Sequence, residues 1–251
     1  MTASSTAIAK VIGTALIVSE DPEATRQVTE AMEELALSVE VCDKLSDALE
    51  RVKRKKLEVT VIDFSLGKQG AIFLEQVRSS PSNRTAITFA ITENSAQTAQ
   101  ALKAGSSFAL QRPLTRESIR HTLQAAYGLI VRERRRYFRY PVSVPFAGSR
   151  KGESEIFGKT INVSERGVAL KTTTPLTAGS EVAVEFTLLD PPLPVSVDCK
   201  VCWNNEKGEA GLQFLFVASE LSSDLQVWLA KRLEEQLPDL VTQRFQSPPR
   251  S

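Results

Sequence analysis

The hydrophobic pattern changes once along the chain, close to Val131, and no other feature of the sequence restricts the fold as much. Before this point, short apolar runs alternate with amphipathic stretches of helical spacing. After it, short runs that alternate apolar and polar residues are separated by turn residues. The two patterns are typical of different fold classes, so the 251 residues predict two domains that meet near Val131.

The first half of the chain predicts a doubly wound α/β domain, which we place at residues 12–130. Asp21 and Pro22 have the form of a helix N-cap followed by proline in the first turn. Five repeats of strand and helix favour a five-stranded parallel sheet with helices on both faces, and functional side chains are then expected at the carboxyl ends of the strands. The expected strands are 14–18, 39–41, 59–64, 86–91 and 108–110, and the expected helices follow Asp21 and cover 45–52, 71–77, 97–104 and 116–130.

The second half predicts a small all-β domain, which we place at residues 141–238. Six short, evenly spaced strands are typical of a six-stranded antiparallel barrel, and a closing amphipathic helix follows them and ends at Pro238. Residues 131–140 form an arginine-rich linker, and the polar residues 239–251 predict a disordered tail. The expected strands are 142–146, 155–163, 167–172, 181–188, 195–203 and 211–217.

Composition argues against several classes of protein. The net charge of +1 gives no global field that favours nucleic acid or a membrane surface, and no apolar run has the length of a membrane span. Three cysteines and one histidine disfavour a disulfide framework or a metal site. Cys199 and Cys202 form a CxxC pair, but this spacing places them on opposite faces of a strand. We expect a cytoplasmic protein that is not an enzyme, with the single histidine, His121, on an exposed helix face.

Basic charge is concentrated in one short stretch. Five arginines lie between positions 132 and 139, against the single acid Glu133. A guanidinium group can pair with two phosphate oxygens, contact the O6 and N7 edge of guanine, or stack on a purine ring. Several arginines on a flexible segment can therefore surround a ligand with phosphates and purine bases. A solvated segment and a nucleic-acid contact are the alternatives for such a run, and balanced charge elsewhere disfavours the second.

Two motifs stand in order around the start of the all-β half. The first is RxxxR, from Arg135 to Arg139, and the second is NxSxxG, from Asn162 to Gly167. A strand that ends near Trp203 and the closing helix follow them. This ordered set resembles the PilZ domain family over nearly half the chain. The resemblance implies a barrel that binds cyclic-di-GMP, a dinucleotide with two phosphates and two guanines.

The resemblance assigns ligand contacts to both motifs. Arg135 and Arg139 match the arginines that contact guanine and phosphate in the family, with neighbouring arginines as helpers. The amide of Asn162 can meet the N1 and N2 hydrogens of guanine. Trp203 has two interpretations, as a stacking partner for a base or as a residue of the barrel core. The expected ligand-binding residues are Arg134, Arg135, Arg136, Arg139, Asn162, Ser164, Gly167 and Trp203.

The α/β half resembles response-regulator receiver domains. Asp63 ends the third expected strand, where that family carries its phospho-accepting aspartate. Ser19 stands where the first acid of the magnesium site is usual, and Arg112 replaces the lysine before proline. Magnesium demands near-ideal octahedral oxygen ligation, so the loss of one carboxylate weakens the site, although Glu20 or Asp21 could compensate. We expect a degenerate receiver that is a protein-interaction domain, with magnesium bound only if the site at Asp63 is active.

These features favour a cyclic-di-GMP-binding signalling effector without a resident cofactor. In this hypothesis, the ligand binds the barrel and the arginine linker and thereby reorients the receiver-like domain. An unidentified protein is expected to contact that domain, and the apolar stripe of the fifth expected helix suggests a homodimer. The alternative is a phosphorylation-driven response regulator that acts at Asp63, with the barrel as its partner-binding output.

Overall fold

The computed structural model describes residues 13–149 and 155–235. The chain divides into two compact units, of which the first ends at Arg134 and the second comprises Arg135–Glu235. The predicted tail at 239–251 and the predicted helix end at Pro238 lie outside the described residues. Within the described part of the chain, none of the helices has the length and apolar character needed to cross a membrane.

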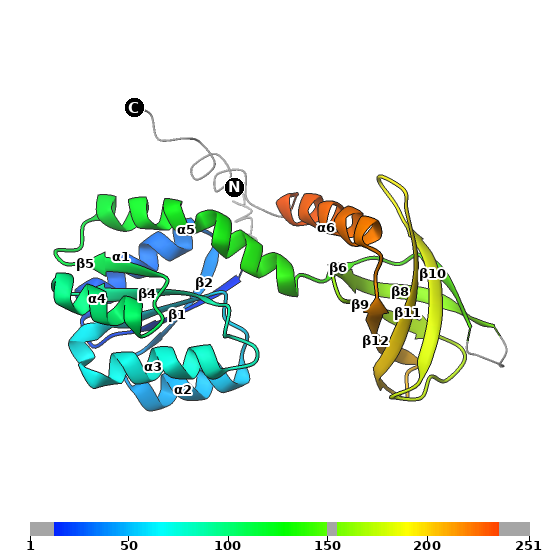
Figure 1. Ribbon diagram of the computed structural model, residues 1–251, viewed down its shortest axis with the longest axis horizontal. Helices are drawn as coiled ribbons and strands as arrows, with labels where there is room; N and C mark the ends of the chain where they lie inside the picture. Colours follow the sequence, from blue (N-terminus) through cyan, green and yellow to red (C-terminus); the bar gives the residue numbers. More distant parts are fainter. Residues whose placement is uncertain (1–12, 150–154, 236–251) are drawn as a thin grey trace, which may run out of the picture. The chain divides into compact units, whose positions relative to one another are not determined.

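The first unit is the predicted doubly wound domain, with a parallel sheet in the order β2-β1-β3-β4-β5. One apolar core joins one face of the sheet to α1 and α5, and a second core joins the opposite face to α2, α3 and α4 (Figure 1). The elements are β1 (Gly13–Val18), α1 (Pro22–Glu34), β2 (Leu37–Cys42), α2 (Leu45–Arg54), β3 (Val59–Asp63), η1 (Phe64–Leu66), α3 (Lys68–Ser79), β4 (Ile87–Thr92), α4 (Ser95–Lys103), β5 (Phe108–Gln111) and α5 (Arg116–Tyr137).

Asp21 caps the first helix as predicted. Its Oδ1 accepts hydrogen bonds from the N–H groups of Glu23 at 2.9 Å and Ala24 at 3.2 Å, and Pro22 is the first helical residue. The backbone hydrogen bond from Ala24 is the main reason that the pKa of Asp21 lies below its ordinary value. The cap fixes the chain just after β1, at the carboxyl edge of the sheet.

Helix α5 continues to Tyr137, beyond the predicted end at Ile130, so most of the predicted linker is helical. Glu133 on this extension is buried, and its Oε1 accepts hydrogen bonds from Lys56 Nζ at 2.5 Å and from Thr85 Oγ1 at 2.8 Å. These contacts with the first unit account for the extension, because most helical stability in proteins comes from the face that a helix packs against its surroundings.

The apolar stripe of α5 faces its own sheet. Ile119, Leu123, Ala126 and Ile130 are buried in the core that α5 shares with α1. Their burial removes the argument for a homodimer through this stripe. His121 lies on the exposed side of the helix, as expected.

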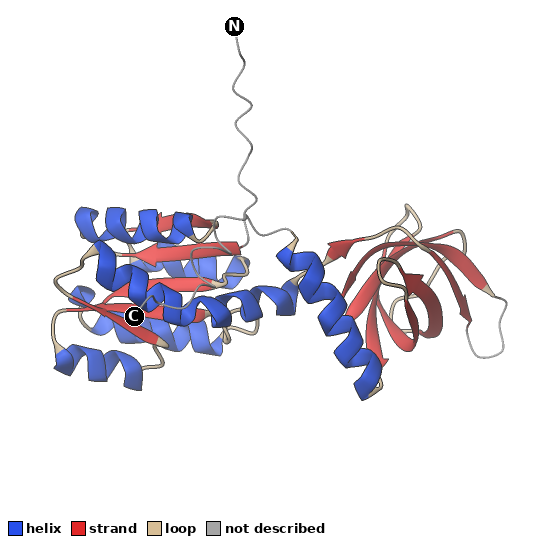
Figure 2. Cartoon of the chain, turned by 90° about the horizontal axis from the view of Figure 1, so that it is seen from above, coloured by secondary structure: helices blue, strands red, loops and turns tan. Residues whose placement is uncertain are grey.

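The second unit is the predicted antiparallel barrel. Strands β7 to β12 form a continuous sheet, and the pairing of β8 with β9 closes it into six strands (Figure 2). Cys199 is buried and Cys202 exposed, which confirms that the CxxC pair spans both faces of its strand. The elements are β6 (Tyr140–Pro141), β7 (Pro145–Ser149), β8 (Ile156–Ser164), β9 (Gly167–Thr172), β10 (Glu181–Leu188), β11 (Leu193–Asn204), β12 (Glu209–Phe216) and α6 (Ser219–Glu234).

The predicted first strand at 142–146 is wrong in its bounds. The chain forms the short β6 first, and β7 begins only at Pro145. Between them, the Thr160 hydroxyl accepts a hydrogen bond from Val144 N at 3.0 Å and donates one to Val142 O at 2.6 Å. A side chain therefore replaces part of the strand pairing at this point, which an alternating sequence pattern does not reveal.

Candidate functional site

Strand β6 brings the two barrel motifs together. It follows Arg139 directly and pairs with β8, so that Tyr140 lies opposite Val163 and Pro141 opposite Asn162. The end of the RxxxR motif and the start of the NxSxxG motif therefore lie on adjacent strands. A ligand site that both motifs share would require this adjacency.

The first motif arginine contacts the second motif. Arg135 Nε lies 3.3 Å from Glu165 Oε1 in the β8–β9 turn, and both side chains are partly buried. Arg139 is exposed and Arg136 half-buried, and neither forms an ion pair with the residues that the structure describes. Three of the four predicted arginines thus belong to the barrel unit.

Arg134 differs from its neighbours. Its Nη1 lies 3.5 Å from Glu58 Oε1, and Glu58 is a buried residue at the start of β3 in the α/β unit. Glu58 also accepts a 2.7 Å hydrogen bond from Thr14 N. The structure does not bring Arg134 together with the other predicted ligand-binding residues.

Asn162 begins a row of side chains on the outside of the barrel. It lies opposite Ala169, which lies opposite Gly211, which in turn lies opposite Trp203. Directly opposed residues of an antiparallel ladder project to the same face, and the alternate positions, such as Leu170, fill the interior. Two small residues therefore separate an amide from an indole. Asn162 Oδ1 is buried and has no hydrogen-bond partner among the described residues.

Trp203 lies on the barrel surface, so its interpretation as a core residue is wrong. The side chain is 47% exposed, and a Cβ added to Gly211 would lie 2.0 Å from Trp203 Nε1. The indole therefore covers Gly211 closely. Its exposed part remains open to solvent, as a stacking surface requires.

Ser164 and Gly167 shape the β8–β9 turn. The Ser164 hydroxyl donates a 3.1 Å hydrogen bond to Gly167 O. A Cβ on Gly167 would lie 2.2 Å from Leu212 O, so glycine is needed for the close approach of β12. Gly167 was expected among the ligand-binding residues, and the structure shows the close approach of a neighbouring strand at this position.

An aromatic cluster behind β6 was not predicted from the sequence. The rings of Tyr140 and Trp228 meet edge to face at 5.3 Å, and the Arg232 guanidinium lies 4.8 Å from the Trp228 ring centroid. Trp228 Nε1 also donates to Leu189 O at 3.1 Å. Helix α6 thereby fixes the strand that follows Arg139. In the sequence, the position of Tyr140 directly after the RxxxR motif was the feature that could have indicated this cluster.

Asp63 ends β3, as predicted, and is 1% exposed. Its Oδ2 accepts hydrogen bonds from Ser19 Oγ at 2.9 Å and from Arg112 Nη2 at 2.8 Å. Its Oδ1 accepts a hydrogen bond from Ser65 N at 3.0 Å. Both oxygens of this carboxylate therefore have donors from the chain itself.

Arg112 contacts two further carboxylates at this edge. Its Nη1 lies 2.7 Å from Asp21 Oδ2 and its Nε 2.9 Å from Glu93 Oε1. Burial opposes the charge of this guanidinium, but the hydrogen bond to Asp21 and the charges of Asp63, Asp21 and Glu93 raise the pKa of Arg112 above its ordinary value. The arginine is thus a permanent cation among three acids.

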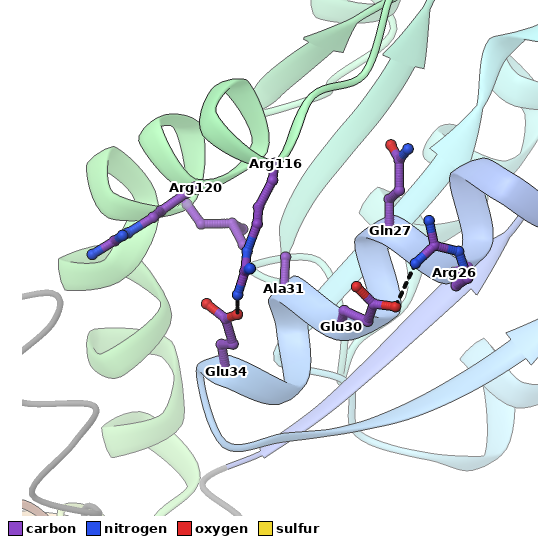
Figure 3. A pocket seen from close by; sticks show the side chains of 8 residues that line it. Arg26, Gln27, Glu30, Ala31, Glu34, Arg116 and Arg120 are labelled. Carbon is purple, nitrogen blue, oxygen red and sulfur yellow. Dashed lines mark hydrogen bonds and ion pairs between the residues drawn. The ribbon is translucent and has the colours of Figure 1, made fainter.

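A pocket lies between α1 and α5 (Figure 3). Within it, Arg26 pairs with Glu30 at 2.6 Å and Arg116 pairs with Glu34 at 2.6 Å. These guanidinium groups already have carboxylate partners, and the pocket contains no residue of either motif. We assign no ligand to it.

The family models match both halves of the chain. Residues 15–124 match the response regulator receiver domain, and residues 133–231 match the PilZ domain. The chain joins a receiver domain to a PilZ domain. Both are regulatory, non-enzymatic domain types. No curated protein matches the chain significantly.

Several solved structures are similar to one half of the chain. The chemotaxis response regulator CheY4 of Vibrio cholerae is 18% identical, with 45% of this chain and 97% of that chain covered and a TM-score of 0.42. The PilZ domain of CeSA from a cellulose-synthesizing bacterium is 16% identical, with coverages of 39% and 98% and a TM-score of 0.31. The Bacillus subtilis inhibitor of motility MotI/DgrA is 17% identical, with coverages of 40% and 52% and a TM-score of 0.35.

The magnesium ion that receiver domains use does not fit the donor set at Asp63. Magnesium takes six oxygen ligands in near-ideal octahedral geometry. Here the Arg112 guanidinium already contacts Asp21 and Asp63. Ser19 Oγ donates to Asp63 and accepts a hydrogen bond from Asp21 N at 3.1 Å. Among the described residues, no three Asp, Glu, His or Cys side chains are grouped as a metal site would need.

Proposed function

We propose that the protein is a cytoplasmic effector that binds cyclic-di-GMP where the RxxxR segment meets the NxSxxG turn of its PilZ domain. The pairing of β6 with β8 is the observation that supports this most directly. Arg135 and Arg139 would supply charge-assisted hydrogen bonds to phosphate and to the guanine edge. The unpartnered Asn162 Oδ1 would accept a hydrogen bond from a guanine N–H, which would remove the cost of leaving it buried alone.

The other motif residues have secondary roles in this proposal. Arg136 assists the two motif arginines, and the exposed part of Trp203 stacks on a base. Ser164 and Gly167 act mainly by shaping the turn that follows Asn162. Arg134 contributes least, because it belongs to the α/β unit and its guanidinium pairs with Glu58 of that unit.

We also propose that ligand binding reorients the receiver domain, to which an unidentified protein partner binds. Arg134 and Arg135 are consecutive residues of α5, yet Arg134 pairs with Glu58 of the first unit and Arg135 with Glu165 of the second. A ligand that draws Arg135 away from Glu165 would therefore act on the end of a helix that begins in the receiver domain. Small-angle X-ray scattering with and without saturating ligand tests this step. An unchanged scattering curve would reject the reorientation and leave binding untouched.

Isothermal titration of the full chain with cyclic-di-GMP tests the binding itself. We expect saturable binding, with affinity reduced about tenfold or more in Arg135→Ala and in Arg139→Ala, since a hydrogen bond to a charged group contributes about 1.5–3 kcal/mol. Arg134→Ala should change the affinity less than either. Arg26→Ala, which removes a surface arginine of α1, is the matched control. Absence of binding to the wild type, or unchanged affinity in both motif variants, would reject the proposal.

A further inference from the structure

We propose that Arg112 is a built-in counter-ion that takes the place of the divalent cation in the receiver domain, so that this domain stays in one state and does not accept a phosphoryl group at Asp63. The inference concerns the α/β unit alone and does not depend on ligand binding by the barrel. The proposal is more specific than a weakened metal site, because it assigns the cation's place to the side chain of Arg112.

Arg112 contacts three carboxylates. Asp21 follows β1, Asp63 ends β3 and Glu93 follows β4, and each lies within 2.7–2.9 Å of a different guanidinium nitrogen. Arg112 itself follows β5. One side chain thus connects the carboxyl ends of four of the five strands, which is the place where a receiver domain otherwise uses a metal ion.

Both carboxylate oxygens of Asp63 already accept hydrogen bonds. Phosphorylation would require one of its carboxylate oxygens to attack phosphorus. Here Oδ2 accepts two hydrogen bonds, from Ser19 and Arg112, and Oδ1 accepts one from Ser65 N. The carboxylate is also 1% exposed. Attack through Oδ2 would displace a charge-assisted bond, which is roughly twice as strong as a neutral one, and attack through Oδ1 would compete with the hydrogen bond from Ser65 N.

The threonine hydroxyl at the end of β4 is also hydrogen-bonded within the domain. Thr92 is 1% exposed, and its Oγ1 lies 2.8 Å from Thr98 Oγ1 on α4. This hydrogen bond fixes the start of α4 to the sheet edge without any contribution from a phosphoryl group. The strand end and the helix are therefore already connected, as expected for a domain held in one state.

The charge state of the cluster supports the same conclusion. Nearby carboxylates raise the pKa of Arg112, and the backbone hydrogen bond from Ala24 lowers the pKa of Asp21. Both shifts favour the charged forms, so Asp21 and Arg112 form an ion pair at neutral pH.

The test compares the wild-type full chain with the double variant Ser19→Asp/Arg112→Lys. Each is titrated with Mn²⁺, followed by electron paramagnetic resonance, and each is incubated with acetyl phosphate and Mg²⁺ and then weighed by mass spectrometry. We expect no modification of the wild type and only weak Mn²⁺ binding to it. The double variant should bind Mn²⁺ at least about tenfold more tightly, the scale on which changes around a metal site act.

We expect acetyl phosphate to phosphorylate the double variant. In this reaction, a carboxylate oxygen of Asp63 forms a bond to phosphorus while the bond from phosphorus to acetate breaks and acetate leaves. Addition of Asp63→Asn should abolish this mass gain. Modification of the wild type at Asp63 would overturn the proposal, as would a folded double variant that still fails to bind Mn²⁺. If the double variant does not fold, Arg112→Lys alone is titrated with Mn²⁺, and an affinity equal to that of the wild type would count equally against the proposal.

Discussion

Arg135 Nε and Glu165 Oε1 lie 3.3 Å apart, so the first arginine of the RxxxR motif pairs with a carboxylate of the NxSxxG turn. Glu165 therefore already forms an ion pair with the guanidinium group that the proposed ligand would need. Glu165 is thus an internal competitor for the phosphate or guanine edge of cyclic-di-GMP.

Glu165→Gln should therefore raise the affinity for cyclic-di-GMP. A partly exposed ion pair contributes up to about 1 kcal/mol, so the expected gain is about two- to fivefold, measured by isothermal titration. Glu206→Gln, an exposed residue of the β11–β12 turn, is the control and should leave the affinity unchanged. Weaker binding by Glu165→Gln would show that Glu165 positions Arg135 instead of competing for it.

Gly167→Ala should destabilise the barrel, because the added Cβ would lie 2.2 Å from Leu212 O. Overpacking of this kind costs about 1–3 kcal/mol. Both tryptophans of the chain, Trp203 and Trp228, lie in the barrel unit, so urea unfolding followed by tryptophan fluorescence reports on that unit.

Gly128→Ala is the matched control for the glycine substitution. Gly128 is an exposed residue of α5, and a Cβ there would have nothing within 4 Å. Alanine should stabilise the helix by about 0.5–1 kcal/mol and leave the barrel transition unchanged. Equal barrel stability in Gly167→Ala and the wild type would contradict the expected clash.

Ligand binding should change the fluorescence of Trp203. Its side chain is 47% exposed, whereas Trp228 is buried. Stacking on a guanine would quench the emission of the exposed indole and exclude water from it. The change should disappear in Trp203→Phe and persist in Arg26→Ala. A full signal in Trp203→Phe would mean that the base stacks elsewhere.

The three cysteines should differ in their reaction with a maleimide reagent at pH 8. Cys202 is exposed and should react first, whereas Cys42 and Cys199 are buried. Burial raises the pKa of Cys199 from its ordinary value of 9.0 to about 12. Labelling of Cys199 before Cys202 in the native protein, seen by peptide mass spectrometry, would contradict this order.

The raised pKa of Cys199 also sets the sign of a pH effect on stability. The folded state favours the neutral thiol, so this contribution to the free energy of unfolding is fully present below pH 9.0 and is lost as the pH rises towards about 12. Cys199→Ala should reduce the slope of barrel stability against pH above pH 9.0. An unchanged slope would show that other groups cause it.

The sequence predicted both fold classes because each half of the chain has its own hydrophobic period. Strands β9 (Gly167–Thr172) and β10 (Glu181–Leu188) have the predicted bounds, since turn residues flank both of them. The length of α5 was not predictable from local pattern. It depends on Glu133 contacting Lys56, which lies 77 residues away in the sequence.

The sequence also predicted part of each candidate site. The motifs located Arg135, Arg139 and Asn162, and the structure places them around the same pair of strands. The sequence also showed that Arg112 stands where a lysine is usual. It did not show that one guanidinium reaches three carboxylates, because that arrangement depends on how four strand ends meet at one edge.

Closure of the barrel by the β8–β9 pairing limits how another protein can recognise it. Each of the six barrel strands is hydrogen-bonded to a neighbour on both sides over part of its length, so the described barrel has no strand with an entirely open edge. The parallel sheet, in contrast, ends at β2 and β5. A partner that binds by adding a strand would therefore find whole open edges on the receiver domain, whereas recognition of the barrel would depend more on its side chains and turns.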